Sequence, residues 1–163
     1  MVSFLSIALF AHSECTSGNC SNRKGIYSFT DGSLYEGQFK NRLFHGKGTM
    51  KYANGNVYIG NWVKNERVGK DQLTFANGDQ YRGDFENNQF WGIGTYRYAD
   101  WDTYSGTWAN NLANGKGVFS FASKERYEGE LVNGKFNGVD AFFYADGTVF
   151  IGNWKDNKNM VRE

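Results

Sequence analysis

Few residues in this sequence are of the types that carry out catalysis. The two histidines are His12 and His45, and no glycine-rich phosphate loop followed by Lys-Ser or Lys-Thr is present. His45 directly precedes Gly46, and we interpret it as a turn residue that hydrogen-bonds the backbone rather than as a general base. The sequence therefore predicts no catalytic residue, no metal ligand, no cofactor site and no enzymatic activity.

Two carboxylates, Asp71 and Asp140, stand where a repeated pattern described below otherwise has a core-facing glycine. An acid in apolar surroundings has a raised pKa and could transfer protons. The alternative, which we favour, is that both side chains turn toward water or cap a nearby turn. They lie several repeats apart, which is too far in an extended sheet for a catalytic carboxylate pair.

Four lysines share one repeated position and could form a ladder on one face of a sheet: Lys24, Lys47, Lys70 and Lys116. Such a ladder could contact the phosphates of anionic lipids or an acidic protein surface. The alternative is that lysine only keeps an outward strand position soluble, and we favour this second interpretation. Ile93 and Val139 interrupt the series.

The only cysteines, Cys15 and Cys20, follow an apolar run at residues 1–11. This run is too short to span a bilayer as a helix, and it resembles the hydrophobic region of a secretory signal without a basic segment before it. We therefore expect an exported or envelope-associated protein with a Cys15–Cys20 disulfide. The alternatives are a buried N-terminal segment in a cytoplasmic or peripheral membrane protein, two free thiols, or lipid attachment at Cys15.

All these residues belong to, or precede, a repeat of 23 residues without insertions. A segment at 1–21 is followed by a half repeat at 22–34, complete repeats at 35–57, 58–80, 81–103, 104–126 and 127–149, and a half repeat at 150–163. A fixed period of this length indicates a repeat architecture. An aromatic residue and, two positions later, a glycine form its framework: Tyr35 and Gly37, Tyr58 and Gly60, Tyr81 and Gly83, Tyr104 and Gly106, Tyr127 and Gly129, and finally Gly152 after Phe150.

Each repeat is expected to form a β-hairpin, because aromatic residue, glycine and large apolar residue alternate at every second position. We predict a register in which Tyr35 lies opposite Tyr52 and Gly106 lies beneath Phe119, so that each glycine makes room for a large side chain across the hairpin. Asn-Gly and Asp-Gly pairs mark turns between repeats. Trp101 and Lys124 replace the glycine in two copies, and those turns are expected to have another shape.

The segments Tyr35-Glu36-Gly37-Gln38-Phe39 and His45-Gly46-Lys47-Gly48 resemble the MORN (membrane occupation and recognition nexus) repeat. The resemblance extends from residue 22 to the C terminus and departs from the pattern at Asp71 and Asp140. It implies an all-β fold, an elongated, twisted antiparallel sheet of consecutive hairpins, which we expect to have about twelve strands. It also implies a role in scaffolding, membrane association or self-association, and no activity.

Composition adds little to this interpretation. The 163 residues fit one domain, and 18 basic against 17 acidic residues leave a net charge of +1, which does not suggest a nucleic-acid partner. The aromatic residues are expected to face inward, away from any base that could stack on them. We predict a non-enzymatic interaction module that binds a protein or a second copy of itself, with no small-molecule substrate. The alternative is a peripheral membrane module that binds anionic phospholipid through the lysine ladder.

Overall fold

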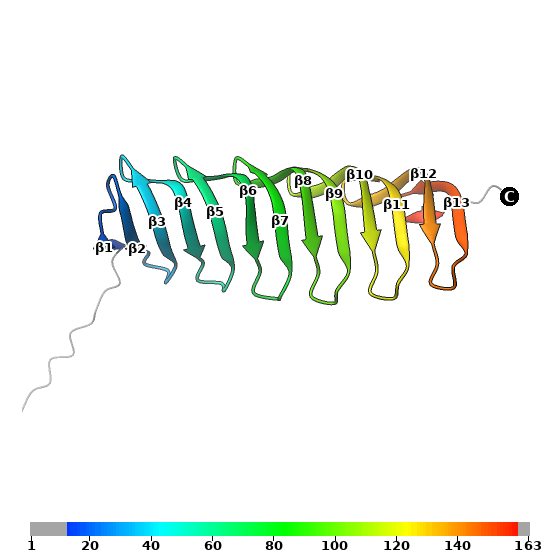
Figure 1. Ribbon diagram of the computed structural model, residues 1–163, viewed down its shortest axis with the longest axis horizontal. Helices are drawn as coiled ribbons and strands as arrows, with labels where there is room; N and C mark the ends of the chain where they lie inside the picture. Colours follow the sequence, from blue (N-terminus) through cyan, green and yellow to red (C-terminus); the bar gives the residue numbers. More distant parts are fainter. Residues whose placement is uncertain (1–12, 160–163) are drawn as a thin grey trace, which may run out of the picture.

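The computed structural model, which describes residues 13–159, is a single antiparallel sheet in which each strand pairs only with its neighbours in sequence (Figure 1). This confirms the predicted all-β fold, with fourteen strands rather than about twelve. The additional strands are short ones at the two ends. The strands are β1 (Glu14–Gly18), β2 (Lys24–Ser28), β3 (Leu34–Lys40), β4 (Leu43–Lys51), β5 (Val57–Val63), β6 (Glu66–Thr74), β7 (Gln80–Glu86), β8 (Gln89–Arg97), β9 (Thr103–Ala109), β10 (Leu112–Ser120), β11 (Arg126–Val132), β12 (Lys135–Phe143), β13 (Val149–Lys155) and β14 (Lys158–Asn159).

The turns between repeats share one shape, and here the prediction for Trp101 and Lys124 is wrong. Both residues have a φ of 76°, close to the 88° of Gly55 in the corresponding turn. The Trp101 amide donates to the Tyr98 carbonyl at 3.1 Å, in the same way as Gly55 donates to the residue three before it. The flanking strands fix the path of the backbone through the turn. Trp101 and Lys124 therefore adopt the left-handed backbone conformation that glycine adopts without strain.

The strands also pair in a different register from the predicted one. Tyr35 lies opposite Met50 rather than Tyr52, and Gly106 lies opposite Gly117 rather than Phe119. The register is set by a two-residue turn with positive φ at both positions, and by a β-bulge at which the pairing shifts. As a result glycine faces glycine, and most strands from β2 to β13 contribute one glycine to a row that crosses the sheet, here called the glycine row. Its members are Gly25, Gly37, Gly48, Gly60, Gly83, Gly94, Gly106, Gly117, Gly129 and Gly152, with Asp71 and Asp140 at the two remaining positions.

The first-position tyrosines lie across this glycine row. A Cβ on Gly37 would be 2.5 Å from the Tyr35 hydroxyl oxygen and 2.6 Å from the Gly48 Cα, so only glycine fits beneath the ring. The hydroxyl donates a hydrogen bond to the Gln38 carbonyl at 2.9 Å. All five complete repeats make the equivalent bond, at 2.8–3.1 Å. Glycine therefore does make room for an aromatic ring, as predicted, and each such ring covers two glycines: Tyr35 lies over Gly37 on its own strand and over Gly48 across the hairpin.

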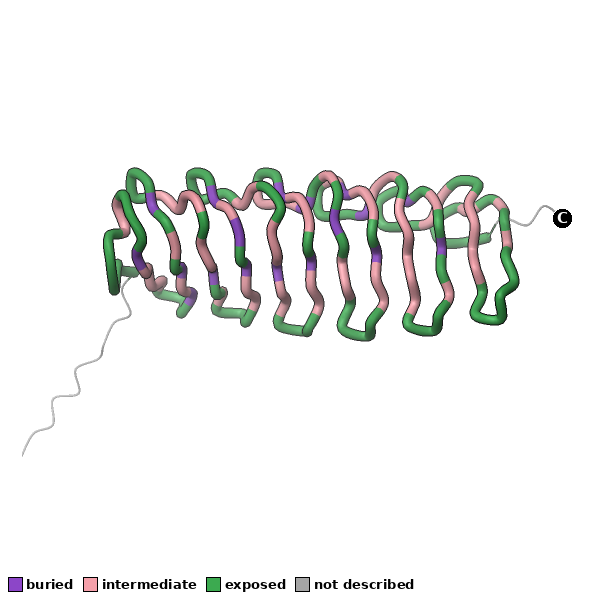
Figure 2. Tube along the Cα trace, in the orientation of Figure 1, coloured by how far each residue is buried: buried purple, intermediate pink, exposed green. Residues whose placement is uncertain are grey.

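Each hairpin bends toward the aromatic face. The bend brings the side chains near the end of the hairpin over the framework tyrosines. Gly46 has a φ of 62°, and beyond it the ring of Phe44 stacks on that of Tyr35 with 3.8 Å between centroids. Phe90 stacks on Tyr81 in the same way, at 3.6 Å. The five tyrosines are 0–1% exposed and form the buried band that crosses the strands, while the turns are exposed (Figure 2). The opposite face of the sheet carries mostly polar side chains and meets solvent.

Candidate functional site

The structure gives no indication of a metal site or a membrane-spanning helix in the part of the chain that it describes. Among residues 13–159, no group of three or more His, Cys, Asp or Glu side chains could hold a metal ion. Over the same range, no helix is long and apolar enough to cross a bilayer.

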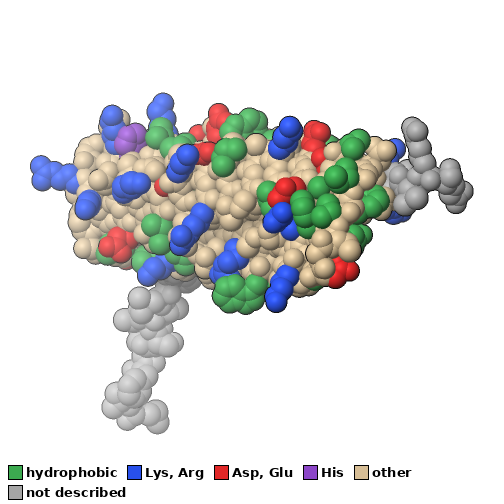
Figure 3. Space-filling model, turned by 45° about the vertical axis from the view of Figure 1, so that its right-hand side comes forward, with side chains coloured by type: hydrophobic (Ala, Val, Ile, Leu, Met, Phe, Trp, Pro, Cys, Tyr) green, Lys and Arg blue, Asp and Glu red, His purple; other side chains and the backbone are tan. Residues whose placement is uncertain are grey.

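A groove with a volume of about 1270 Å³ crosses β1 to β7 on the face opposite the aromatic core. Its floor includes the backbone of the glycine row, and its walls are the side chains that precede and follow each glycine, because neighbouring residues of a strand point to opposite faces. Three predicted lysines line it, Lys24, Lys47 and Lys70, together with Arg82. Figure 3 shows lysine and arginine side chains standing apart from one another on the surface, with uncharged surface between them.

The fourth lysine of the predicted ladder lies elsewhere. Lys116 lines a separate, smaller hollow with Ser105 and Asp140, beyond the position at which Ile93 interrupts the series on β8. Lys24, Lys47 and Lys70 lie on alternate strands, so their Cα atoms are about 9.4–9.8 Å apart from one to the next. The structure thus brings together three of the four lysines.

Only one groove lysine forms an ion pair among the described residues. Lys47 Nζ lies 4.0 Å from Asp71 Oδ1, and the lysine side chain is 74% exposed. An ion pair of this length at an exposed lysine contributes little to stability. The lysine charges of the groove therefore remain accessible to a ligand.

The Asp71 side chain is buried and its hydrogen-bond donors lie in strand β5, so the prediction that it turns toward water or caps a turn is wrong. Its side chain is 3% exposed and lies above Gly60, whose missing Cβ leaves the room that it needs. The carboxylate accepts hydrogen bonds from the Asn61 amide, the Asn61 side chain and the Tyr58 hydroxyl, each at 2.9 Å. The hydroxyl has one proton, which it shares between this carboxylate and the Asn61 carbonyl. These donors satisfy the carboxylate inside the sheet, which is why it has no need to reach water.

Asp140 repeats this arrangement at the other end of the sheet. It lies above Gly129 and accepts from the Tyr127 hydroxyl at 2.7 Å and the Glu130 amide at 3.1 Å. Burial and then the hydrogen bond to Asp140 raise the pKa of Tyr127, and burial and Asp71 act in the same direction on the pKa of Tyr58. Both aspartates are structural acceptors for a tyrosine of the framework rather than acids exposed to a substrate.

His45 lies within β4, so its predicted place in a turn is wrong; the turn ends before Leu43. The side chain is neither fully buried nor fully exposed. His12 and the apolar run at 1–11 lie outside the described residues. The two histidines therefore supply no candidate catalytic group in the described structure.

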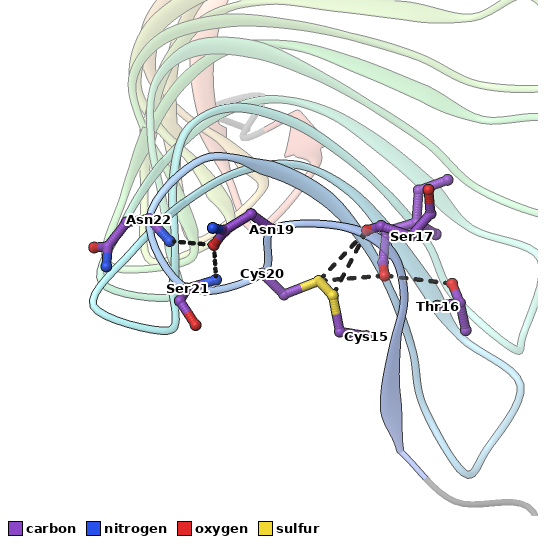
Figure 4. Close-up of a disulfide and its surroundings, with 8 residues drawn as sticks. Cys15, Thr16, Ser17, Asn19, Cys20, Ser21 and Asn22 are labelled. Atoms are coloured by element: carbon purple, nitrogen blue, oxygen red, sulfur yellow. Dashed lines mark hydrogen bonds between the residues drawn. A yellow bond between two sulfur atoms is a disulfide. The ribbon is translucent and has the colours of Figure 1, made fainter.

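The Cys15 and Cys20 sulfur atoms are bonded at 2.07 Å, in a loop at the N-terminal end of the sheet (Figure 4). Cys15 lies in β1, which pairs with β2, and Cys20 follows that strand. The Cys20 sulfur would lie 2.8 Å from a Cβ on Gly25, the first glycine of the row. The cysteine thus covers this glycine as Tyr35 covers Gly37, and the loop caps the row.

Some residues of the groove and core were not identified from the sequence. Arg82 occupies an outward repeat position that is Glu36 and Ile59 in the two preceding repeats, so no recurring residue type marks it as part of a site. Phe44, Phe90 and Phe136 recur at 46 residues, twice the repeat length, and each stacks on a framework tyrosine. A comparison of alternate repeats, rather than of successive ones, would identify these three phenylalanines.

Comparisons with known proteins agree with this architecture. A family model described as MORN repeat matches residues 35–57, 58–80, 81–103, 104–126 and 127–149. The TCP domain of Drosophila melanogaster SAS-4 (dCPAP), solved in complex with a proline rich motif of Ana2 (dSTIL), is 14% identical with a TM-score of 0.55, over 94% of this chain and 84% of that chain. At this identity the likeness is one of fold.

A second solved structure is less similar. The wild-type TCP10 domain of Danio rerio CPAP, in complex with a peptide of Danio rerio STIL, is 13% identical with a TM-score of 0.25, over 87% of this chain and 84% of that chain. No curated protein sequence matches the chain.

Proposed function

Since the chain belongs to the MORN repeat family, we propose that it is a non-enzymatic interaction module that binds another protein on the outer face of its sheet. The observation that carries the proposal is the groove across β1 to β7, open on a face that no second layer of the described structure covers. Large apolar side chains are also exposed on this face, including Ile59 (55%) and Ile93 (59%). Exposed apolar side chains next to a groove are typical of an interaction surface.

A solved structure of the same fold supports a protein segment as the partner. The SAS-4 TCP domain shares the fold and is described in complex with a proline rich motif of Ana2. A long single sheet of this kind has room for an extended peptide along a groove. We accordingly favour a peptide segment of a larger protein over a small molecule.

The test is an affinity capture from the native host, followed by mass spectrometry. The wild-type chain is compared with an Ile59→Glu variant, whose side chain is exposed and contributes nothing to the buried core. We expect the wild-type protein to capture a partner that the variant retains poorly. Capture of the same proteins by the wild-type chain, the variant and the bare support would contradict the proposal.

We also propose that the chain functions in an oxidising compartment. The supporting observations are the apolar run at 1–11 and the cysteine pair at bonding distance. Protein isolated from the host without reductant should resist alkylation at both cysteines. Two freely alkylated thiols would contradict the proposal.

A further inference from the structure

We propose that the groove across β1 to β7 binds an acidic peptide in the polyproline II conformation, with a carboxylate at every third residue. This inference rests on the proposed function, because it specifies the chemistry of the protein segment that the sheet binds. It is carried by four features of the groove: its charge, the spacing of its lysines, its width and its floor.

The charge of the groove favours an acidic ligand. Lys24, Lys47, Lys70 and Arg82 line it, against two carboxylates, Glu36 and Asp71. The Asp71 carboxylate is buried and already accepts three hydrogen bonds. Within residues 13–159, neither Lys24, Lys70 nor Arg82 forms an ion pair. The accessible charge is thus predominantly positive, and charge complementarity requires carboxylates on the partner.

The spacing of the lysines matches one peptide conformation. Two strands of a sheet advance by about 9.4–9.8 Å, and this is the step from Lys24 to Lys47 and from Lys47 to Lys70. A polyproline II helix has three residues per turn and rises about 3.1 Å per residue, so its repeat is about 9.3 Å. Over the two steps the mismatch is about 1 Å or less, which flexible lysine side chains absorb. A carboxylate at every third residue therefore meets each lysine in turn.

Other peptide conformations fit less well. Side chains on one face of a β-strand recur every two residues, about 6.6–6.8 Å apart, and fall out of step with the lysines. The walls of the groove, represented on β4 by Lys47 and Thr49, are two residues apart along the strand, so about 6.6–6.8 Å separates their Cα atoms. An α-helix with side chains is about 10–12 Å wide and cannot enter between them.

The floor of the groove suits a ligand without backbone donors. Positions 37, 48 and 60 face the aromatic side, so on the groove side their backbone lies uncovered between the outward side chains of their neighbours, and a ligand can approach it. The backbone amides and carbonyls of these central strands are directed toward neighbouring strands on both sides. A proline-rich peptide, whose prolines lack amide hydrogens and which is already extended in solution, loses few hydrogen bonds and little entropy on binding.

The experiment measures the affinity of fluorescent peptides for the full chain by anisotropy at low salt. The first peptide contains four Pro-Pro-Glu units, the second has the same composition with its glutamates consecutive, and the third has lysine in place of glutamate. The variants are Lys24→Gln and Lys70→Gln. Lys116→Gln is the matched control, because it occupies the same repeat position outside the groove.

We expect the Pro-Pro-Glu peptide to bind more tightly than the clustered one, and the lysine peptide not to bind. Each groove variant should weaken binding roughly two- to fivefold, the range for one exposed ion pair, and Lys116→Gln should leave it unchanged. All three lysines are exposed, so circular dichroism should show the same fold for every variant.

Three outcomes would overturn the inference: equal affinity for the spaced and the clustered peptide, equal effects of Lys70→Gln and Lys116→Gln, or no peptide binding. If vesicles of phosphatidylserine and phosphatidylcholine sediment with the chain and the peptide does not bind, the groove lysines serve a membrane instead. A host partner captured equally by the wild-type chain and the Lys24→Gln/Lys70→Gln variant would leave the proposed function intact and reject this inference alone.

Discussion

Gly106→Ala tests directly how the framework tyrosines and the glycine row pack. A Cβ at this position would lie 2.5 Å from the Tyr104 hydroxyl oxygen, 2.6 Å from the Gly117 Cα and 2.7 Å from the Lys116 carbonyl oxygen. The last two atoms belong to the backbone of the neighbouring strand, which cannot withdraw without stretching its hydrogen bonds. We therefore expect the free energy of unfolding to fall by about 3 kcal/mol, the upper end of the range for overpacking.

Urea denaturation followed by circular dichroism measures this free energy, and thermal unfolding gives a second estimate. In a chain of this length, about 3 kcal/mol corresponds to a fall in melting temperature of roughly 6–12 °C. Tyr104→Phe provides a double-mutant cycle. Alone it removes the hydrogen bond from the hydroxyl to the Thr107 carbonyl, 3.1 Å long, at a cost of about 1 kcal/mol. Combined with Gly106→Ala it also removes one of the close contacts of the new Cβ. The loss of unfolding free energy in the double variant should therefore be smaller than the sum of the losses in the two single variants.

Two results would refute this reasoning. An unchanged free energy of unfolding in Gly106→Ala would mean that the glycine is not closely packed. Strictly additive costs in the cycle would mean that the tyrosine hydroxyl does not lie over the glycine. A larger loss in the double variant than in the two single variants together would point to the same conclusion.

Four further predictions concern the other features of the sheet. Asp71→Ala should lower the free energy of unfolding by about 2–4 kcal/mol, because three hydrogen-bond donors lose a charged acceptor; a thermal shift below 1 °C would contradict this. Lys124→Gly should raise it by about 1–2 kcal/mol, because φ is 76° there, and differential scanning fluorimetry would detect the gain or its absence. Replacing Cys15 and Cys20 by serine should cost less than the roughly 3 kcal/mol of a fifteen-residue loop, and should speed hydrogen exchange in β1 and β2 only. Burial raises the pKa of Tyr35 from 10.0 to about 12; the neutral phenol is favoured in the folded state, so its contribution to stability is complete below pH 10 and is lost as the pH rises toward 12. Tyrosinate absorbance and circular dichroism should then change together in this pH window, whereas ionisation of every tyrosine near pH 10 in a folded protein would contradict it.

The period and the alternation of residues were sufficient to predict the hairpins, their order and the framework of tyrosine and glycine. The register was not predictable from them, because it depends on a bulge between Gly37 and Phe39 and on a two-residue turn. A shift of this kind leaves the sequence period unchanged while it alters which residues face each other. It also conceals the stacking of Phe44 on Tyr35, which exists only because the hairpin bends.

The candidate site was predicted only in part, for related reasons. The shared position of Lys24, Lys47 and Lys70 is visible in the sequence, but their groove arises from side chains of two outward rows and the glycine floor between them. The sequence favours an Asp71 side chain that turns toward water or caps a turn. Its burial depends on the room left by Gly60 and on donors from Tyr58 and Asn61, which no single repeat reveals.

The pairing of each strand with its sequence neighbours alone has a consequence for how the chain folds. Residues opposite each other in β3 and β4 are at most 17 positions apart, as with Leu34 and Lys51. Few loops of high entropy have to close, so this β protein should fold faster than sandwiches or barrels of its size. Any hairpin can nucleate, and neighbours then add one at a time. Unfolding should likewise begin at an end and proceed repeat by repeat, so a peptide held across β2 to β6 would protect that part of the sheet while the distal repeats open.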